Sequence, residues 1–288
     1  MRSPPKVPPL PGRCAPNPAN LHHAKECVVD DSSVVLLGLV GSGIAGLCTG
    51  IGALPIFLFS HISQNTQGVL LGFGAGVMLA ATSFSLIIPG LETAQLNTEN
   101  NFLAALIVGS GILLGGIFLW LSHRYFPHEH FFKGKEGVEA GNLKRVWLFI
   151  LAITIHNFPE GLAVGVSFGG GDIANGTALT LGIGIQNIPE GLVVAISLLT
   201  ENYSRPTAFW ISLLTGLVEP VGGLLGAMAV SLFLPLLPLA MGFAAGAMLF
   251  VISDEIIPES HRLGYEKAAT AGVMIGFVLM FFLDVTVG

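Results

Sequence analysis

Charged side chains are scarce in this sequence. Asp, Glu, Lys and Arg make up 10% of the 288 residues, whereas hydrophobic residues make up 52%. A water-soluble domain of this length needs far more charge to cover its surface, so a soluble globular fold is excluded. The mean hydropathy of +0.76 leads to the same conclusion, and the lipid bilayer is the expected solvent for most of the chain.

Basic residues and cysteines are also few. The formal net charge is −6, so there is no basic field of the kind that binds nucleic acid, and we expect no nucleic-acid partner. Three cysteines are present and none forms a CxxC pair. Cys14 and Cys27 either form a disulfide in an oxidising compartment or remain free thiols, and Cys48 lies in an apolar run as a small core residue.

Long apolar runs fill the chain after its N-terminal tail. Residues 1–32 hold seven of the 17 prolines and few large apolar side chains, which is typical of a disordered tail. The remainder, 33–288, predicts an all-α polytopic membrane protein with eight transmembrane helices. The predicted spans are 33–60, 68–91, 102–122, 146–168, 175–199, 207–233, 237–257 and 268–287.

Lys and Arg in the loops predict the orientation. Three loops on one side carry eight basic residues, the opposite loops carry none, and the N-terminal tail carries four. The positive-inside rule therefore places both termini on the outer side, in what we expect to be a bacterial inner (plasma) membrane. The longest inner loop, 123–145, contains His123, His128 and His130, which either receive or sense released metal or are incidental.

Two segments of the sequence recur. Residues 156–162 (HNFPEGL) recur at 186–192 (QNIPEGL), and residues 72–79 (GFGAGVML) recur at 242–249 (GFAAGAML). The members of each pair lie an odd number of spans apart, so the copies are antiparallel in the membrane. This pattern predicts inverted repeats, spans 1–3 against spans 6–8 and span 4 against span 5, with a substrate site near mid-bilayer. The alternative for the glycine-rich pair is chance similarity between apolar helices.

Polar side chains near the centres of spans four to six predict a cation site. His156 and Glu160 are four residues apart, so they share one face of a helix, and Gln186 and Glu190 repeat this spacing. Glu219 adds a third carboxylate halfway along span six. Between Arg145 and Arg262 the only basic residue is Arg205, which lies in a loop.

The three glutamates therefore have no basic partner within their spans. Three ionised, unpaired carboxylates at helix centres cost on the order of 8–10 kcal/mol, so a proton, solvent or a bound cation must compensate them. An anion carrier would need charge of the opposite sign. Imidazole with carboxylates suits Zn²⁺, and also Cd²⁺, Fe²⁺, Mn²⁺ and Co²⁺, whereas Mg²⁺ and Ca²⁺ rarely recruit histidine. We expect these ions as transported substrates and no separate cofactor.

The motifs HNFPEG (156–161), QNIPEG (186–191), LVEP (217–220) and GFGAGVMLAATSFSLIIPG (72–90) carry a resemblance. From about residue 33 to residue 288 the chain resembles the ZIP (Zrt/Irt-like) metal transporter family, in particular its bacterial GufA-type branch. The resemblance implies eight helices with outward termini, zinc uptake toward the cytoplasm and a binuclear metal centre. We also expect a homodimer.

Carried over by motif, the resemblance implies two sets of ligands. One ion would be held by His156, Glu160, Gln186 and Glu190, with Met78 close by. The second would use Asn157, Glu160, Asn187, Glu190 and Glu219, with two glutamates bridging. Asn187 departs from a similar member of the family that has aspartate at this position, and the loss of a negative charge should weaken the second ion.

The remaining polar residues suggest a path through the membrane. It would run from Glu92 and Ser85 at the outer mouth, through the central cluster, to Asp254 and Glu255 and then to His261 on the inside. The alternative for Glu92 and His261 is a solvated helix end, and Asp284 is interpreted as an interfacial residue.

Two other functions compete with that of a carrier. A metal-selective channel would use the same ligands, and sequence does not separate the two. An intramembrane metal-dependent hydrolase would need three protein ligands and a general base, but the predicted spans contain only one histidine, His156, and no HExxH motif. We therefore expect a transporter and not an enzyme.

Overall fold

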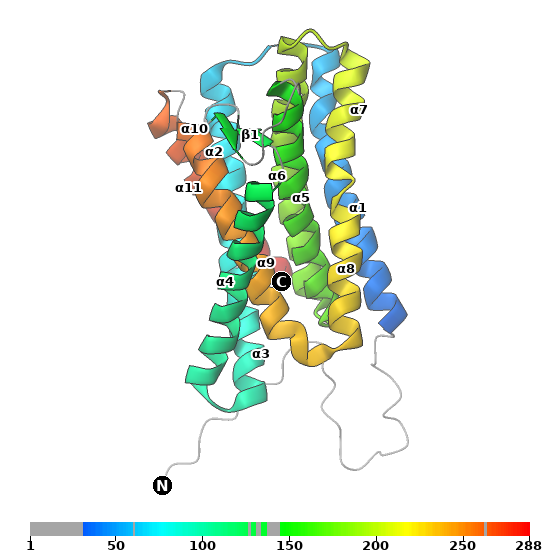
Figure 1. The fold of residues 1–288 in the computed structure, drawn as a ribbon, viewed down its shortest axis with the longest axis vertical. Helices are drawn as coiled ribbons and strands as arrows, with labels where there is room; N and C mark the ends of the chain where they lie inside the picture. Colours follow the sequence, from blue (N-terminus) through cyan, green and yellow to red (C-terminus); the bar gives the residue numbers. More distant parts are fainter. Residues whose placement is uncertain (1–30, 60, 126–127, 131–133, 137–144, 262–263) are drawn as a thin grey trace.

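The structure is a computed structural model that describes residues 31–59, 61–125, 128–130, 134–136, 145–261 and 264–288. The helices run roughly along the long axis of the molecule (Figure 1). Residues 1–30 of the predicted disordered tail and most of the predicted inner loop lie outside the described residues, whereas residues 31 and 32 begin the first helix.

Eight segments of the described chain are long and apolar enough to cross a membrane. This number confirms the predicted all-α fold with eight spans. The segments are Ser32–Phe57, Gln64–Thr98, Asn101–Tyr125, Ile150–Gly169, Ile173–Thr200, Arg205–Leu232, Leu234–His261 and Glu266–Val287.

Several spans contain more than one element. The elements are α1 (Asp31–Ala53), η1 (Leu54–Phe57), α2 (Gln64–Ala80), η2 (Ala81–Ile87), α3 (Ile88–Thr98), α4 (Asn101–Tyr125), α5 (Arg145–Gly169), α6 (Ile173–Thr200), α7 (Arg205–Gly216), α8 (Glu219–Leu232), η3 (Leu234–Leu236), α9 (Leu237–Val251), η4 (Ile252–Ile256), α10 (Ile257–His261) and α11 (Glu266–Val287). Two short strands, β1 (His128–His130) and β2 (Gly134–Glu136), form an antiparallel hairpin after α4. Because α4 continues to Tyr125, His123 belongs to a helix and not to the predicted loop.

The helices form two groups that differ in their packing partners. In the first group, α1 packs against α5, α6, α7 and α8, and α5 packs against α8. In the second group, α2 packs against α11, and α4 packs against α9. The two groups meet where α2 and α11 contact α6 and where α9 contacts α5.

Proline interrupts the regular hydrogen bonding of the second group. The elements η2 and η4 are π-helical segments that precede Pro89 and Pro258, and each follows shortly after one copy of the glycine-rich repeat. Pro89 has no N–H, so the carbonyl of Ser85 loses its helical donor. The side chain of Asn175 in α6 replaces that donor, with Nδ2 2.8 Å from Ser85 O.

Span six breaks beside a predicted ligand. Helix α7 ends at Gly216, and α8 begins at Glu219 with Pro220 in its first turn, where the missing N–H is tolerated. Gly161 of α5 lies so close that a Cβ there would collide with the backbone of Glu219. The absence of a side chain at Gly161 thus lets α5 bring Glu160 to the start of α8.

Candidate metal centre

The predicted ligands of α5, α6 and α8 lie in the protein interior. Asn157, Glu160, Asn187 and Glu219 are 0% exposed, and Glu190 is half-buried. His156 and Gln186 are also buried. The recurring motif thus places its polar side chains inside the bundle rather than in lipid, as helices with intramembrane charges require.

Many of these buried atoms have no hydrogen-bond partner among the described residues. They include both carboxylate oxygens of Glu160, both amide atoms of Asn157, and one carboxylate oxygen each of Glu190 and Glu219. Buried polar atoms in proteins are nearly always satisfied, because each unsatisfied group costs about 1–3 kcal/mol. A cation bound among them would remove that cost.

The acidic side chains also repel one another. Glu160 interacts electrostatically with Glu190, and Glu219 interacts with both. Arg205, the one basic residue between Arg145 and Arg262, lies at an exposed end of the bundle, where it donates a hydrogen bond to Phe57 O. Among the described residues, no lysine or arginine is therefore placed to compensate the three carboxylates when they are ionised.

Asn187 is hydrogen bonded on both sides of its amide. Its Nδ2 donates to Ala45 O at 2.9 Å and to Glu219 Oε1 at 2.6 Å. Its Oδ1 accepts from Gln186 Nε2 at 2.6 Å. Asn187 therefore links a carboxylate of the predicted second ion site to the amide ligand of the first.

Two cavities reach this centre. The smaller has a volume of about 30 Å³ and is lined by His156, Gln186 and Glu190 together with apolar residues and Gly74. The larger, of about 350 Å³, is also lined by His156 and Glu190, and it extends past Ser197 to residues near the α10 end of the bundle. A small, mostly apolar chamber that contains these three polar side chains thus adjoins a wider one that leads to one end of the protein.

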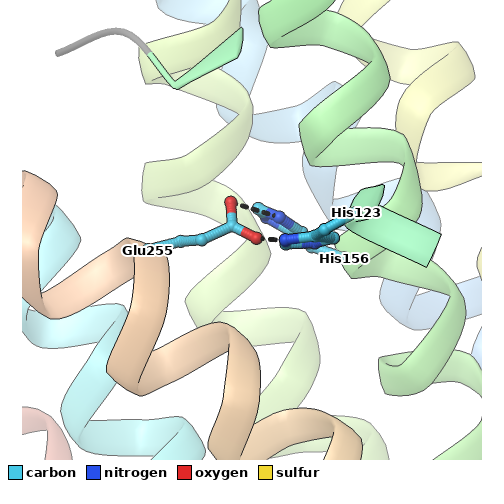
Figure 2. Close-up of side chains that lie close together, drawn as sticks. All are labelled: His123, His156 and Glu255. Carbon is cyan, nitrogen blue, oxygen red and sulfur yellow. Dashed lines mark ion pairs between the residues drawn. The ribbon is translucent and has the colours of Figure 1, made fainter. Parts of the chain in front are cut away.

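His156 is not directed at Glu160 but at Glu255. Its Nε2 lies 2.5 Å from Glu255 Oε2, and His123 Nε2 lies 3.0 Å from Glu255 Oε1 (Figure 2). All three side chains are buried, and their ligand atoms lie within 4.8 Å of one another. Two imidazoles and a carboxylate are a ligand set that suits Zn²⁺.

The other predicted pathway residues at this end have different surroundings. Asp254 lines a groove between α4 and α9 with Trp120, separate from the cavity lined by Glu255. His261 is engaged locally, with Nδ1 2.9 Å from Ile257 O and Nε2 3.1 Å from Thr270 Oγ1. The larger cavity is instead lined by Glu259 and His61.

Toward the α3 end, the centre is closed by packing and hydrogen bonds. Met78 is 1% exposed, and Ser85 is fully buried and donates to Asp284 Oδ1 at 2.6 Å. Glu92 is exposed, one turn beyond Pro89. Asp284, interpreted from the sequence as interfacial, thus contacts a predicted pathway residue.

His123 and Asp284 are the functional candidates that the site prediction lacked. His123 was visible in the sequence only as one of several histidines near an inner loop, without a periodic motif. The contact between Ser85 and Asp284 joins residues 199 positions apart, and neither has a motif that signals the other.

Known proteins are similar to this chain in sequence. The family described as ZIP zinc transporter matches residues 129–284. Zinc transporter GufA of Myxococcus xanthus is 51% identical over 87% of this chain and 99% of its own length. Zinc transporter ZIPB of Bordetella bronchiseptica is 48% identical over 85% of this chain and 80% of its own length. Human zinc transporter ZIP11 is 35% identical over 89% of this chain and 98% of its own length. The chain therefore belongs to the ZIP zinc transporter family, in its bacterial GufA-type branch.

Proposed function

We propose that this protein transports divalent transition-metal cations, with zinc as the main substrate, toward the cytoplasm. The observation that carries the proposal is the set of carboxylates of Glu160, Glu190 and Glu219, which are buried or half-buried, have unpartnered oxygens and have no lysine or arginine beside them among the described residues. Zinc is favoured because His156 shares the small cavity with Glu190 and because the similar proteins are named zinc transporters. Cd²⁺, Fe²⁺, Mn²⁺ and Co²⁺ are further substrates to be tested.

The ion would bind at His156, Glu160, Gln186 and Glu190 and leave through the larger cavity. Glu255 and His123 would receive it, because His156 already contacts Glu255 in this conformation. The carboxylate of Glu255 and the imidazoles of His123 and His156 would lower the barrier for the cation to leave the acidic centre. The central carboxylates would attract the cation to the centre, and Glu255 and His123 would then replace the central ligands as the cation leaves.

The conformation supports alternating access. The centre communicates with the α10 end through a cavity of about 350 Å³, while buried Ser85 and its bond to Asp284 close the α3 end. We assign this state as open to the cytoplasm. The path from outside would begin at Glu92 and pass Ser85 and Met78.

The predicted inverted repeat would supply a means to exchange the two states. A π-helical segment follows each copy of the glycine-rich repeat, η2 after α2 and η4 after α9, and α2 and α9 run in opposite directions (Figure 1). In our proposal, the group of α1, α5, α6, α7 and α8 moves against the group of α2, α4, α9 and α11. The ligands of α5, α6 and α8 would travel with the first group.

The distribution of Lys and Arg supports placing both termini outside, in a bacterial plasma membrane. A homodimer remains part of the proposal, as do Asp254 and His261 as residues of the inner path. Both residues lie outside the larger cavity. Asp254 would contact the ion from the groove beside α4, and His261 would contact it from the end of α10.

Metal flux into proteoliposomes tests the proposal. Purified protein should take up Zn²⁺ above the level of protein-free liposomes, with saturation and with exchange against zinc inside the vesicle. Single-channel currents in a planar bilayer would instead identify a metal-selective channel. Metal-dependent cleavage of lipid or peptide without flux would identify an intramembrane hydrolase.

A further inference from the structure

Asn187 has an orientation that its neighbours fix chemically. The amide nitrogen carries two hydrogens, and both have acceptors, Ala45 O at 2.9 Å and Glu219 Oε1 at 2.6 Å. A backbone carbonyl only accepts, so the nitrogen and not the oxygen of Asn187 must face Ala45. The side chain is 0% exposed, so no solvent competes for these bonds.

The orientation of Asn187 determines that of Gln186. Since Oδ1 of Asn187 is an acceptor, Gln186 must present its Nε2, which lies 2.6 Å away. The Oε1 atom of Gln186 then points elsewhere, and it is the nearest atom to a Cβ built on Gly74 of α2, at 3.3 Å. Gly74, Gln186, His156 and Glu190 line the same cavity of about 30 Å³. The one atom of Gln186 that binds cations therefore lies beside Gly74, which lines the same cavity.

The same bonds leave no place for a cation between Asn187 and Glu219. An ion there would need an oxygen from residue 187, but the amide hydrogens of Asn187 point toward Glu219. Turning the amide would break its bonds to Ala45, Glu219 and Gln186. Donation from Asn187 instead offsets part of the charge of Glu219, as a second ion would do.

We propose that Asn187 is a positioning residue that makes the centre bind a single divalent cation. Its amide nitrogen takes the place of a second ion beside Glu219. Its amide oxygen holds the nitrogen of Gln186, so that the oxygen of Gln186 is turned toward the site of the first ion. This inference rests on the proposed transport function. Aspartate at position 187 would reverse both effects, because it cannot donate to Ala45 O and would set a second carboxylate beside Glu219.

Anomalous scattering at the zinc edge, from crystals of the full chain grown with zinc, tests the inference. In the wild type we expect a zinc peak beside Gln186 and Glu190 and none between Asn187 and Glu219. Asn187→Asp should add a peak between residues 187 and 219. Asn97→Asp, the same chemical change at an exposed position, should add none.

Two results would overturn the inference. One is a zinc peak between Asn187 and Glu219 in the wild type, which decides the matter even if Asn187→Asp does not fold. The other is a folded Asn187→Asp protein with no second peak. If the proposed function itself is wrong, the wild type takes up no zinc, whereas failure of this inference alone leaves uptake intact.

Transport kinetics give an independent readout of the positioning role. Loss of a side chain that orients a metal ligand typically lowers metal affinity about 10- to 100-fold. Asn187→Ala should therefore raise the KM for zinc by about that factor and leave the maximal rate near that of the wild type. A lower maximal rate with unchanged KM would indicate a merely structural role and contradict the inference.

Discussion

The Nε2 atom of His156 lies 2.5 Å from Oε2 of Glu255, and this contact joins α5 of one helix group to η4 of the other. His156 also lines the small cavity beside Gln186 and Glu190. One imidazole therefore adjoins both the central acids and the exit acid. In the conformation described here, its Nε2 faces the exit.

This contact predicts the effect of Glu255→Gln. Without the carboxylate, the exit offers His156 and the departing ion a weaker partner, and a hydrogen bond to a charged group contributes about 1.5–3 kcal/mol. The maximal rate of zinc uptake should fall roughly tenfold or more, while the KM should not rise. Glu266→Gln, at the exposed start of α11, is the matched control. An unchanged maximal rate would remove Glu255 from the release step.

Zinc should stabilise the folded protein through Glu160. At a zinc concentration about one hundred times the Kd, binding to the native state adds about 2.7 kcal/mol to the free energy of unfolding. The unfolding temperature in detergent should therefore rise when zinc is added and fall back to its original value when a chelator is added. Glu160→Gln should lose most of this shift, because the ion loses a buried anionic ligand. An equal shift in the variant would place the stabilising zinc elsewhere.

The close approach of α5 to α8 predicts a difference between two glycines. Gly161→Ala would drive a methyl group into the backbone of Glu219, and such overpacking typically costs 1–3 kcal/mol. We expect a lower unfolding temperature in detergent and reduced uptake. Gly109→Ala in α4 meets open space, so the same change there should leave both properties near those of the wild type. Equal effects at the two positions would show that the contact does not matter.

The inward opening predicts one-sided chemical labelling. Ser197 is 6% exposed and lines the larger cavity, whereas Ala178 of the same helix is 0% exposed and lines neither cavity of the centre. In a chain whose three cysteines are replaced, Ser197→Cys should react with a membrane-impermeant thiol reagent added from the cytoplasmic side. Ala178→Cys should remain unreactive. Labelling of Ser197→Cys from the outer side alone would reverse the proposed orientation.

Periodicity and composition were sufficient to predict the spans. Apolar runs marked eight helices, and the Pro-Glu motifs marked the polar residues at their centres, as at Pro159 and Glu160. The interruption of span six at Glu219 agrees with the Pro220 that follows it. These features are local, so a few consecutive residues carry the signal.

The rest of the site depends on contacts between residues far apart in the sequence, which the sequence does not predict. His123 reaches Glu255 only because α4 packs against α9, and no residue near His123 indicates that pairing. The bond between Ser85 and Asp284 depends on the packing of α2 and η2 against α11. Likewise, the sequence marked Asn187 only as a departure from one relative with aspartate, and its hydrogen bonds to Ala45 and Glu219 depend on the packing of α1 against both α6 and α8.

The central claim is that buried acids bind the transported ion, and zinc uptake by Glu160→Ala and Glu190→Ala in proteoliposomes tests it most directly. Glu201→Ala, at the exposed end of α6, serves as the control for protein insertion and folding. Both central variants should fold and insert like the control, yet take up no zinc above protein-free liposomes. Wild-type uptake by Glu160→Ala would contradict the account.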